Sequence, residues 1–189
     1  LFADPEPRPA RHDVRLEDVH IRNAPGIEAR RIPDTSVNQR AKNYHWGDFT
    51  TGLFEAKDRD FDSVLLLNHD DTLAEGPGFN VFIVKGETVI TPDWHCLHGI
   101  TRRTALEIAG ELGLSVEERG VPLDEALNAD EIFVTTSGGG PVPVTALDER
   151  VFSNGAPGPV ASRIRERYWD WMTRPEHLSP IDYGQMAAE

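Results

Sequence analysis

Apolar residues recur at the spacing of an α-helix along two stretches of the chain. Over 101–112, Ala105, Ile108 and Leu112 would lie on one face, and Gly113 follows at the position where helices commonly end. A similar apolar face is present over 159–172. The spacing therefore predicts a helix in each stretch, with one side packed against the rest of the molecule.

Short apolar runs elsewhere have the character of β-strands. The runs at 64–67 and 79–84 are almost continuous, which favours strands buried on both faces. Further strands are expected at 20–32, 88–90, 116–118, 131–136 and 142–147, and shorter helices at 47–59 and 123–127. Short strands interspersed with helices predict an α/β or α+β fold, with a mixed-strand core packed against helices.

Length and composition narrow the class of protein. The 189 residues suit one domain, and the net charge of −13 disfavours nucleic acid or an anionic membrane as a partner. A single cysteine, Cys96, excludes an internal disulfide framework, and no apolar run approaches the ~18 residues of a membrane span. We therefore expect a cytoplasmic protein. The first residue is Leu1 rather than Met, which suggests a fragment, a processed product or an edited sequence.

Two clusters resemble metal sites but lack essential features. His95, Cys96 and His98 cannot easily converge on one tetrahedral ion from within four residues. The alternating aspartates of 58–62 lack the glycine and glutamate of a calcium loop. The sequence also lacks a Gly-x-x-x-x-Gly-Lys loop and a Gly-x-Gly-x-x-Gly loop. We predict no metal site and no nucleotide-binding loop of these types.

Three other segments are compatible with ligand chemistry. Gly-Ile-Thr at 99–101 stands where the clearest helix begins, and backbone N–H groups at a helix start can bind an anion. Thr-Thr-Ser at 135–137 precedes three glycines, which allow close approach of a ligand. Lys42 lies among aromatic residues, where a lysine can become a nucleophile. Taken singly, these patterns are also typical of a helix cap, a flexible hairpin and a solvated lysine.

Their order along the chain carries a resemblance to a known family. The motifs are Lys-Asn at 42–43 with Trp-Gly-Asp at 46–48, Ala-Glu-Gly-Pro-Gly-Phe-Asn at 74–80, Leu-x-Gly-Ile-Thr-Arg at 97–102 and Thr-Thr-x-Gly-Gly at 135–139. This series resembles the fold-type IV (class IV, branched-chain-like) aminotransferases, which use pyridoxal 5'-phosphate. The first and last motifs look most like the (R)-selective amine transaminases. The resemblance runs from about Arg31 to Tyr183.

The resemblance implies a role for each motif. Lys42 would form the Schiff base with the cofactor aldehyde and shuttle the substrate α-proton. Glu75 would keep the pyridine nitrogen protonated. Further cofactor contacts are implied for Leu97, Gly99, Ile100, Thr101, Thr135 and Thr136, and substrate-pocket positions for Trp46, Ser137, Gly138 and Gly139.

The resemblance also implies a domain organisation. Residues 31–175 would form the large cofactor-binding domain, a mixed-strand core or pseudo-barrel with packed helices. Residues 1–30 would be a linker or remnant and 176–189 a tail. The smaller N-terminal domain of the family, which supplies a phosphate-binding arginine, has no counterpart in 1–30, so it would be missing or belong to another chain. Family members are dimers, so a homodimer is expected.

The implied activity is transfer of an amino group from an amine or amino acid, of the (R)-amine or D-amino acid type, to a 2-keto acid. Two departures bear on the subgroup, since Ser137 replaces a smaller residue and Pro77 a common serine. An aminodeoxychorismate lyase-like enzyme and a catalytically incompetent fragment remain alternatives. The Trp-Gly-Asp segment favours the transaminase.

Overall fold

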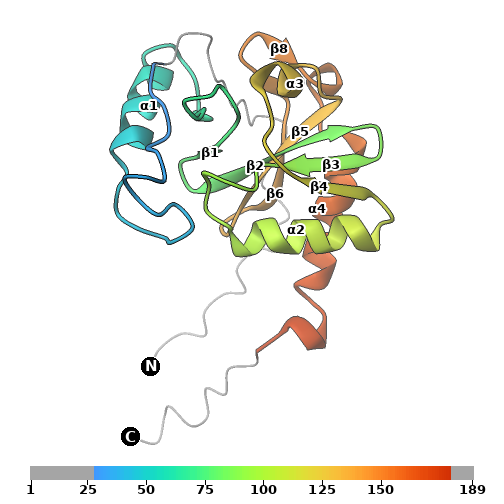
Figure 1. The fold of residues 1–189 in the computed structure, drawn as a ribbon. Coiled ribbons are helices and arrows are strands. Elements are labelled where there is room, and N and C mark those ends of the chain that lie inside the picture. The colour runs from blue at the N-terminus through green and yellow to red at the C-terminus, as the bar shows by residue number, and fades with distance from the viewer. Residues whose placement is uncertain (1–27, 180–189) are drawn as a thin grey trace, which may run out of the picture.

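The computed structural model describes residues 28–179, and its centre is a mixed β-sheet (Figure 1). Five strands follow the order β4-β3-β2-β5-β6, and the short strand β1 pairs with β2. The strands are β1 (Glu75–Gly76), β2 (Phe79–Lys85), β3 (Thr88–Thr91), β4 (Ser115–Glu118), β5 (Glu131–Thr136) and β6 (Gly140–Val144). A separate hairpin joins β7 (Ala146–Leu147) and β8 (Arg150–Val151).

The described residues also contain four α-helices. They are α1 (Gly47–Lys57), α2 (Ile100–Glu111), α3 (Leu123–Leu127) and α4 (Pro159–Trp171), and short 3-10 turns lie at η3 (Ser153–Gly155) and η4 (Pro175–His177). Of these helices, α2 and α4 pack on one face of the sheet, and α1 packs against the segment that contains Val64 and Leu66. β2 pairs antiparallel with β1, β3 and β5, whereas β3 and β4 are parallel and are connected through α2. A parallel pair needs such a crossover, because a tight turn cannot return the chain in the same direction.

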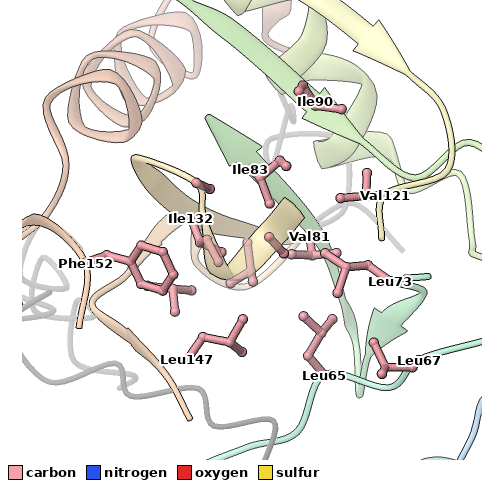
Figure 2. Packing of buried hydrophobic residues seen from close by; sticks show 14 residues of the cluster. Leu65, Leu67, Leu73, Val81, Ile83, Ile90, Val121, Ile132, Leu147 and Phe152 are labelled. Carbon is pink, nitrogen blue, oxygen red and sulfur yellow. The ribbon is translucent and has the colours of Figure 1, made fainter. Parts of the chain in front are cut away.

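Both faces of the central strands are buried, which explains their nearly continuous apolar sequence. Val81 and Ile83 of β2 belong to a first cluster with α3, the β7 region and the segment 65–73, and Figure 2 shows these side chains converging. Phe82 and Val84 point to the other face and belong to a second cluster with α2 and α4. The sheet therefore lies between two cores, with α2 on one side and α3 on the other (Figure 1).

The predicted fold class is confirmed by this mixed sheet with helices on both sides. The helices predicted over 101–112 and 159–172 are present as α2 and α4. The strand predicted over 64–67 is wrong in form. That segment is buried, but it forms no regular strand: Leu66 exchanges backbone hydrogen bonds with Ala74 and Glu75, and Leu67 makes isolated bridges to Arg30 and Leu73.

Two further strand predictions differ from the structure. The strand expected over 142–147 is divided into β6 and β7. Most of the strand expected over 20–32 lies outside the described residues, and within them Arg30 makes only an isolated bridge. Among residues 28–179, no helix combines the length and apolar character needed to cross a membrane.

Candidate active site

A cavity lies where β1, the start of α2, the end of β5 and the loop before α1 meet. Of the predicted site residues, the following line it: Lys42, Trp46, Glu75, Leu97, Gly99, Ile100, Thr101, Thr135, Thr136 and Ser137. Gly138 and Gly139 belong to the turn that follows Ser137, beyond the residues that line the cavity. Segments separated by almost a hundred positions along the chain therefore share one cavity.

The hairpin between β1 and β2 places a carboxylate at the cavity wall. Gly76 pairs with Phe79, which leaves Pro77 and Gly78 as the two central turn residues. Gly78 has φ of +83°, and proline followed by a glycine in this conformation is typical of a type II turn. The register sets Glu75 directly opposite Asn80, so the turn sequence fixes which two polar side chains meet.

Glu75 is only 5% exposed and is held at both oxygens. Its Oε1 accepts hydrogen bonds from Nε and Nη2 of Arg31 at 3.2 and 3.1 Å, and its Oε2 accepts one from the backbone N–H of Leu97 at 3.0 Å. Burial raises the pKa of Glu75, while the Leu97 N–H and the Arg31 charge oppose that rise. The carboxyl is therefore poised between a neutral form favoured by burial and an ionised form favoured by its partners.

Arg31 is shared between two carboxylates. Its Nη1 donates to Oδ2 of Asp48, in the first turn of α1, and its guanidinium lies 4.2 Å from the centre of the Phe49 ring. The same Asp48 oxygen accepts the Ile32 N–H at 2.8 Å. A carboxylate is also favoured at this end of a helix by the helix dipole. Arg31, Asp48 and Glu75 thus form a buried cluster with two negative charges and one positive charge when all are ionised.

Asn80 connects this cluster to the loop that precedes α2. Its Nδ2 donates to the Leu97 carbonyl at 2.6 Å and lies 3.4 Å from Oε2 of Glu75. A Cβ on Gly99 would lie 2.5 Å from Oδ1 of Asn80, a separation too short for real atoms. Glycine at position 99 is therefore what allows the loop to approach β2 this closely.

The start of α2 has the properties of an anion site. Gly99 occupies the N-cap position without a side-chain cap, and the first turn carries no acidic residue. Thr135 is paired with Asn80 on the adjacent strand. It is 2% exposed, and its Oγ1 has no hydrogen-bond partner among the described residues. Unpaired N–H groups and a buried unpartnered hydroxyl at one cavity wall favour an acceptor-rich ligand. Thr136, the last residue of β5, is half-buried and also lines the cavity.

Lys42 is exposed on the loop before α1 and reaches the cavity from that side. This loop is tied to the segment that carries Leu97 at two points. Nη2 of Arg40 donates to the Asp93 carbonyl at 3.3 Å, and the His95 ring pairs with Asp34 at 2.9 Å. The loop has no regular secondary structure, so long-range contacts hold it in place.

Comparison with known proteins places the chain in a family. Residues 4–147, which include Lys42, Glu75 and Thr135, match the amino-transferase class IV family. The chain belongs to the class IV aminotransferases.

Two curated relatives and one solved structure illustrate the similarity of this class IV aminotransferase to others. It is 36% identical over 142 residues to the branched-chain-amino-acid aminotransferase of Pseudomonas aeruginosa, covering 75% of this chain and 46% of the relative. It is 36% identical over 107 residues to the D-alanine aminotransferase of Bacillus licheniformis, covering 56% of this chain and 37% of the relative. The chain therefore spans about half, or less, of the length of these relatives.

The solved structure is the branched-chain amino acid aminotransferase from Thermobaculum terrenum in its PLP-form. It superimposes with a TM-score of 0.72 at 33% identity, covering 82% of this chain and 52% of that one. Similarity at this level shows that the class IV aminotransferase has the fold expected from the motif series.

Several residues that line the cavity or lie beside it had no role assigned from the sequence of this class IV aminotransferase. Arg31, Asp48 and Asn80 hold Glu75 or its neighbours, and the buried Gln39 lines the cavity with an unpartnered Oε1. Asp48 and Asn80 stand within the quoted motifs, so their positions were a usable signal. Arg31 and Gln39 had no comparable signal, because their contacts join distant segments.

The histidine and cysteine cluster set aside above has separate partners. His95 pairs with Asp34, His98 contacts the Asp93 carbonyl at 2.9 Å, and the buried Cys96 thiol donates to the Pro92 carbonyl at 3.5 Å. Burial raises the pKa of Cys96 to about 12. The three side chains thus contribute to local loop structure.

Proposed function

We propose that this chain is the cofactor-binding part of a pyridoxal 5'-phosphate-dependent transaminase, which moves an amino group from an amine or amino acid to a 2-keto acid. One observation carries the proposal. A single cavity brings together Lys42, a buried carboxylate held by Arg31, and the uncapped start of α2. These three groups match the aldehyde, the basic ring nitrogen and the phosphate of that cofactor.

The phosphate fits the end of the cavity formed by α2 and β5. Backbone N–H groups of Ile100 and Thr101 and the hydroxyls of Thr101, Thr135 and Thr136 are donors suited to phosphate oxygens. The unpartnered Oγ1 of Thr135 supports this assignment, because a buried hydroxyl is expected to find a partner. Gly99 would allow close approach of the phosphate.

The ring fits between Glu75 and Leu97. When bound, pyridoxal phosphate supplies an aldehyde that takes up the amino group and a protonated ring that accepts electrons from the substrate. Ionised Glu75 would hold the proton on the ring nitrogen, and Arg31 would keep the carboxylate ionised and oriented. Leu97 would pack against one face of the ring.

Lys42 would perform two tasks through its Nζ atom. It would attach covalently to the aldehyde before substrate arrives, and afterwards it would carry a proton to and from the substrate carbon. Its exposed position on a loop allows the side chain to move between these tasks. Trp46 and the turn formed by Ser137, Gly138 and Gly139 would shape the substrate end.

The finer assignments belong to the same proposal. The motifs favour an (R)-amine or D-amino acid donor, and the relatives described above carry branched-chain and D-alanine names. We further propose that residues 31–175 form the cofactor-binding domain, that 1–30 link it to the rest of the protein, that 176–189 form a tail, and that the protein acts as a homodimer.

Covalent trapping tests the cofactor assignment. The full-length protein, incubated with pyridoxal phosphate and reduced with borohydride, should carry the label on Lys42. The chain has two other lysines, Lys57 and Lys85, which serve as internal controls. Label on Lys57 or Lys85 instead of Lys42, or no label, would contradict the proposal.

A substrate panel tests the reaction. (R)-1-phenylethylamine and L-leucine would each be assayed with pyruvate and 2-oxoglutarate as acceptors, and D-alanine with 2-oxoglutarate alone, because its transfer to pyruvate would return the starting compounds. We expect turnover with (R)-1-phenylethylamine and D-alanine. Activity with L-leucine alone would overturn the donor assignment, and elimination of pyruvate from aminodeoxychorismate without any transfer would favour the lyase.

A further inference from the structure

The turn between β5 and β6 has little in its own sequence to fix its shape. It runs from Thr136 to Gly140, which pair with each other, and contains three consecutive glycines. Ser137 and Gly138 are exposed, and nothing lies within 4 Å of the position that a Cβ would take on Gly138. Glycines lose the most conformational freedom on folding, so such a turn needs outside support to stay in one position.

Arg165 of α4 supplies that support. The residue is 8% exposed, and its Nη1 donates to the carbonyl of Gly139 at 3.0 Å and to that of Pro141 at 2.7 Å. These two carbonyls lie on either side of Gly140. Hydrogen bonds from a charged donor are stronger than those between neutral groups. One guanidinium therefore holds the backbone at two points, at the end of the turn and at the start of β6.

Tyr168, three residues further along α4, adds a steric contact on the same stretch. Gly140 has φ of +66°, and a Cβ there would lie 2.6 Å from Cε1 of Tyr168. The ring of Tyr168 thus fills the space that a side chain at position 140 would need. One face of α4 therefore both binds and packs against the turn.

Burying this guanidinium is unfavourable and is not needed for core packing. No carboxylate forms an ion pair with Arg165 within the part of the chain that the structure describes, and burial lowers the pKa of its guanidinium. Ile164 and Tyr168 of the same helix already fill the second cluster. The guanidinium lies 5.7 Å from the centre of the Trp169 ring and donates its hydrogen bonds to the Gly139 and Pro141 carbonyls, so the position of the turn is what these hydrogen bonds secure.

We propose that Arg165 is a positioning residue that fixes the β5–β6 turn and thereby the width and selectivity of the substrate end of the cavity. This inference rests on the proposed function, in which Ser137, Gly138 and Gly139 shape the substrate pocket. The ring of the cofactor would be held separately by β1, β2 and the loop before α2, through Glu75, Asn80 and Gly99. Only Thr136 is shared between the turn and the proposed phosphate site. Release of the turn should therefore affect the amino donor more than the cofactor.

Three variants of the full-length protein test this inference. Arg165→Met keeps the length of the side chain and removes its donors, and Arg165→Lys keeps the charge and some of the donors. Arg163→Met is the matched control, because Arg163 is exposed on the same helix. The measurements are amide hydrogen exchange of residues 136–140, KM and kcat for D-alanine and (R)-1-phenylethylamine, and the Kd of pyridoxal phosphate.

For Arg165→Met we expect amide exchange in 136–140 and KM for the amino donor to rise by at least about tenfold, because both charge-assisted hydrogen bonds to the turn are lost. The ratio of kcat/KM for the two donors should move closer to one. The kcat values and the cofactor Kd should stay within about twofold of the wild type. Arg165→Lys should fall between the wild type and Arg165→Met, and Arg163→Met should match the wild type.

Two results would overturn the inference. One is unchanged amide exchange and KM in Arg165→Met. The other is a cofactor Kd that weakens as much as KM, which would make Arg165 a general support of the cavity. If the wild type turns over none of the donors, the proposed function fails, and the exchange measurement alone still decides whether Arg165 holds the turn.

Discussion

The two sides of the cavity are built in different ways. Glu75 lies in the sheet, almost inaccessible to water, with hydrogen bonds from Arg31 and Leu97. Lys42 lies opposite on an exposed loop that is anchored through its neighbours Arg40 and Asp34. The difference is that the buried carboxylate is held at both oxygens, whereas the lysine that would have to move in the proposed reaction is left accessible.

The largest effect is expected on catalytic activity, when Lys42 on the loop side of the cavity is replaced. Lys42→Ala should reduce transamination by at least about a thousandfold, because both covalent attachment and proton transfer would be lost. Its melting temperature without cofactor should stay close to that of the wild type, since the side chain is exposed. Lys57→Ala, at an exposed position in α1, is the control. A large fall in melting temperature for Lys42→Ala would mean that the lysine is structural.

The sheet side should respond in stability. Arg31→Met would leave Asp48 and Glu75 buried without their shared cation, which we expect to lower the free energy of unfolding by about 3–5 kcal/mol. Urea unfolding of the variant and the wild type at neutral pH measures this change. An unchanged midpoint would show that the two carboxylates find other partners or take up protons.

A smaller and pH-dependent effect is expected for Glu75→Gln. The pKa of Glu75 is raised above its ordinary value of 4.5, mainly by burial, so the folded protein binds a proton at this site more tightly than the unfolded chain. The stability that this protonation contributes is present below pH 4.5 and is lost as the pH rises through the folded value. Glutamine does not titrate, so the variant should not lose this stability. The melting temperature of Glu75→Gln minus that of the wild type should therefore increase as the pH rises through that window.

The same variant should retain the cofactor but turn over roughly 10- to 100-fold more slowly, the effect of one lost charge-assisted hydrogen bond. Paired melting curves across the pH range and turnover at neutral pH provide the two measurements. A pH-independent difference in melting temperature would exclude Glu75 as the titrating group. Equal turnover would remove its role at the ring.

The smallest change in stability is expected when the contact between the loop before α1 and His95 is weakened. Asp34→Asn weakens the contact of Asp34 with the His95 ring, in which both side chains are more than a third exposed. Such surface pairs contribute about 0–1 kcal/mol, so the free energy of unfolding should hardly change. Amide exchange in the 32–46 loop should nevertheless become faster. A loss of stability as large as that of Arg31→Met would contradict the proposed contrast between the two sides.

The sequence predicted the regular helices and the motif residues better than the contacts that join them. The periodicity over 101–112 yields α2 almost residue for residue, because an amphipathic helix is determined by its own local pattern. The buried segment at 64–67 has the composition of a strand, but its pairing depends on other segments, and it makes only scattered backbone contacts at Leu66 and Leu67. A local apolar pattern therefore indicates that a segment is buried, but it does not determine which other segment it pairs with.

The same limit applies to the site. Lys42, Glu75 and Thr135 stand in motifs that can be recognised from the sequence, and the structure brings all three to one cavity. Arg31 contacts Glu75 across 44 positions, and Arg165 contacts Gly139 across 26. No local pattern marks either arginine, because each is defined by the position of another element.

The pairing of Asn80 with Thr135 links correct folding to assembly of the site. Both residues lie on the face of the sheet that carries Phe82 and Phe133, and their neighbours alternate between the two cores. If β2 slipped by one residue against β5, Asn80 would face the wrong core and its hold on Leu97 would be lost. A misregistered sheet would thus also lose the proposed cofactor site, so the cofactor, if bound as proposed, would selectively stabilise the correctly paired chain.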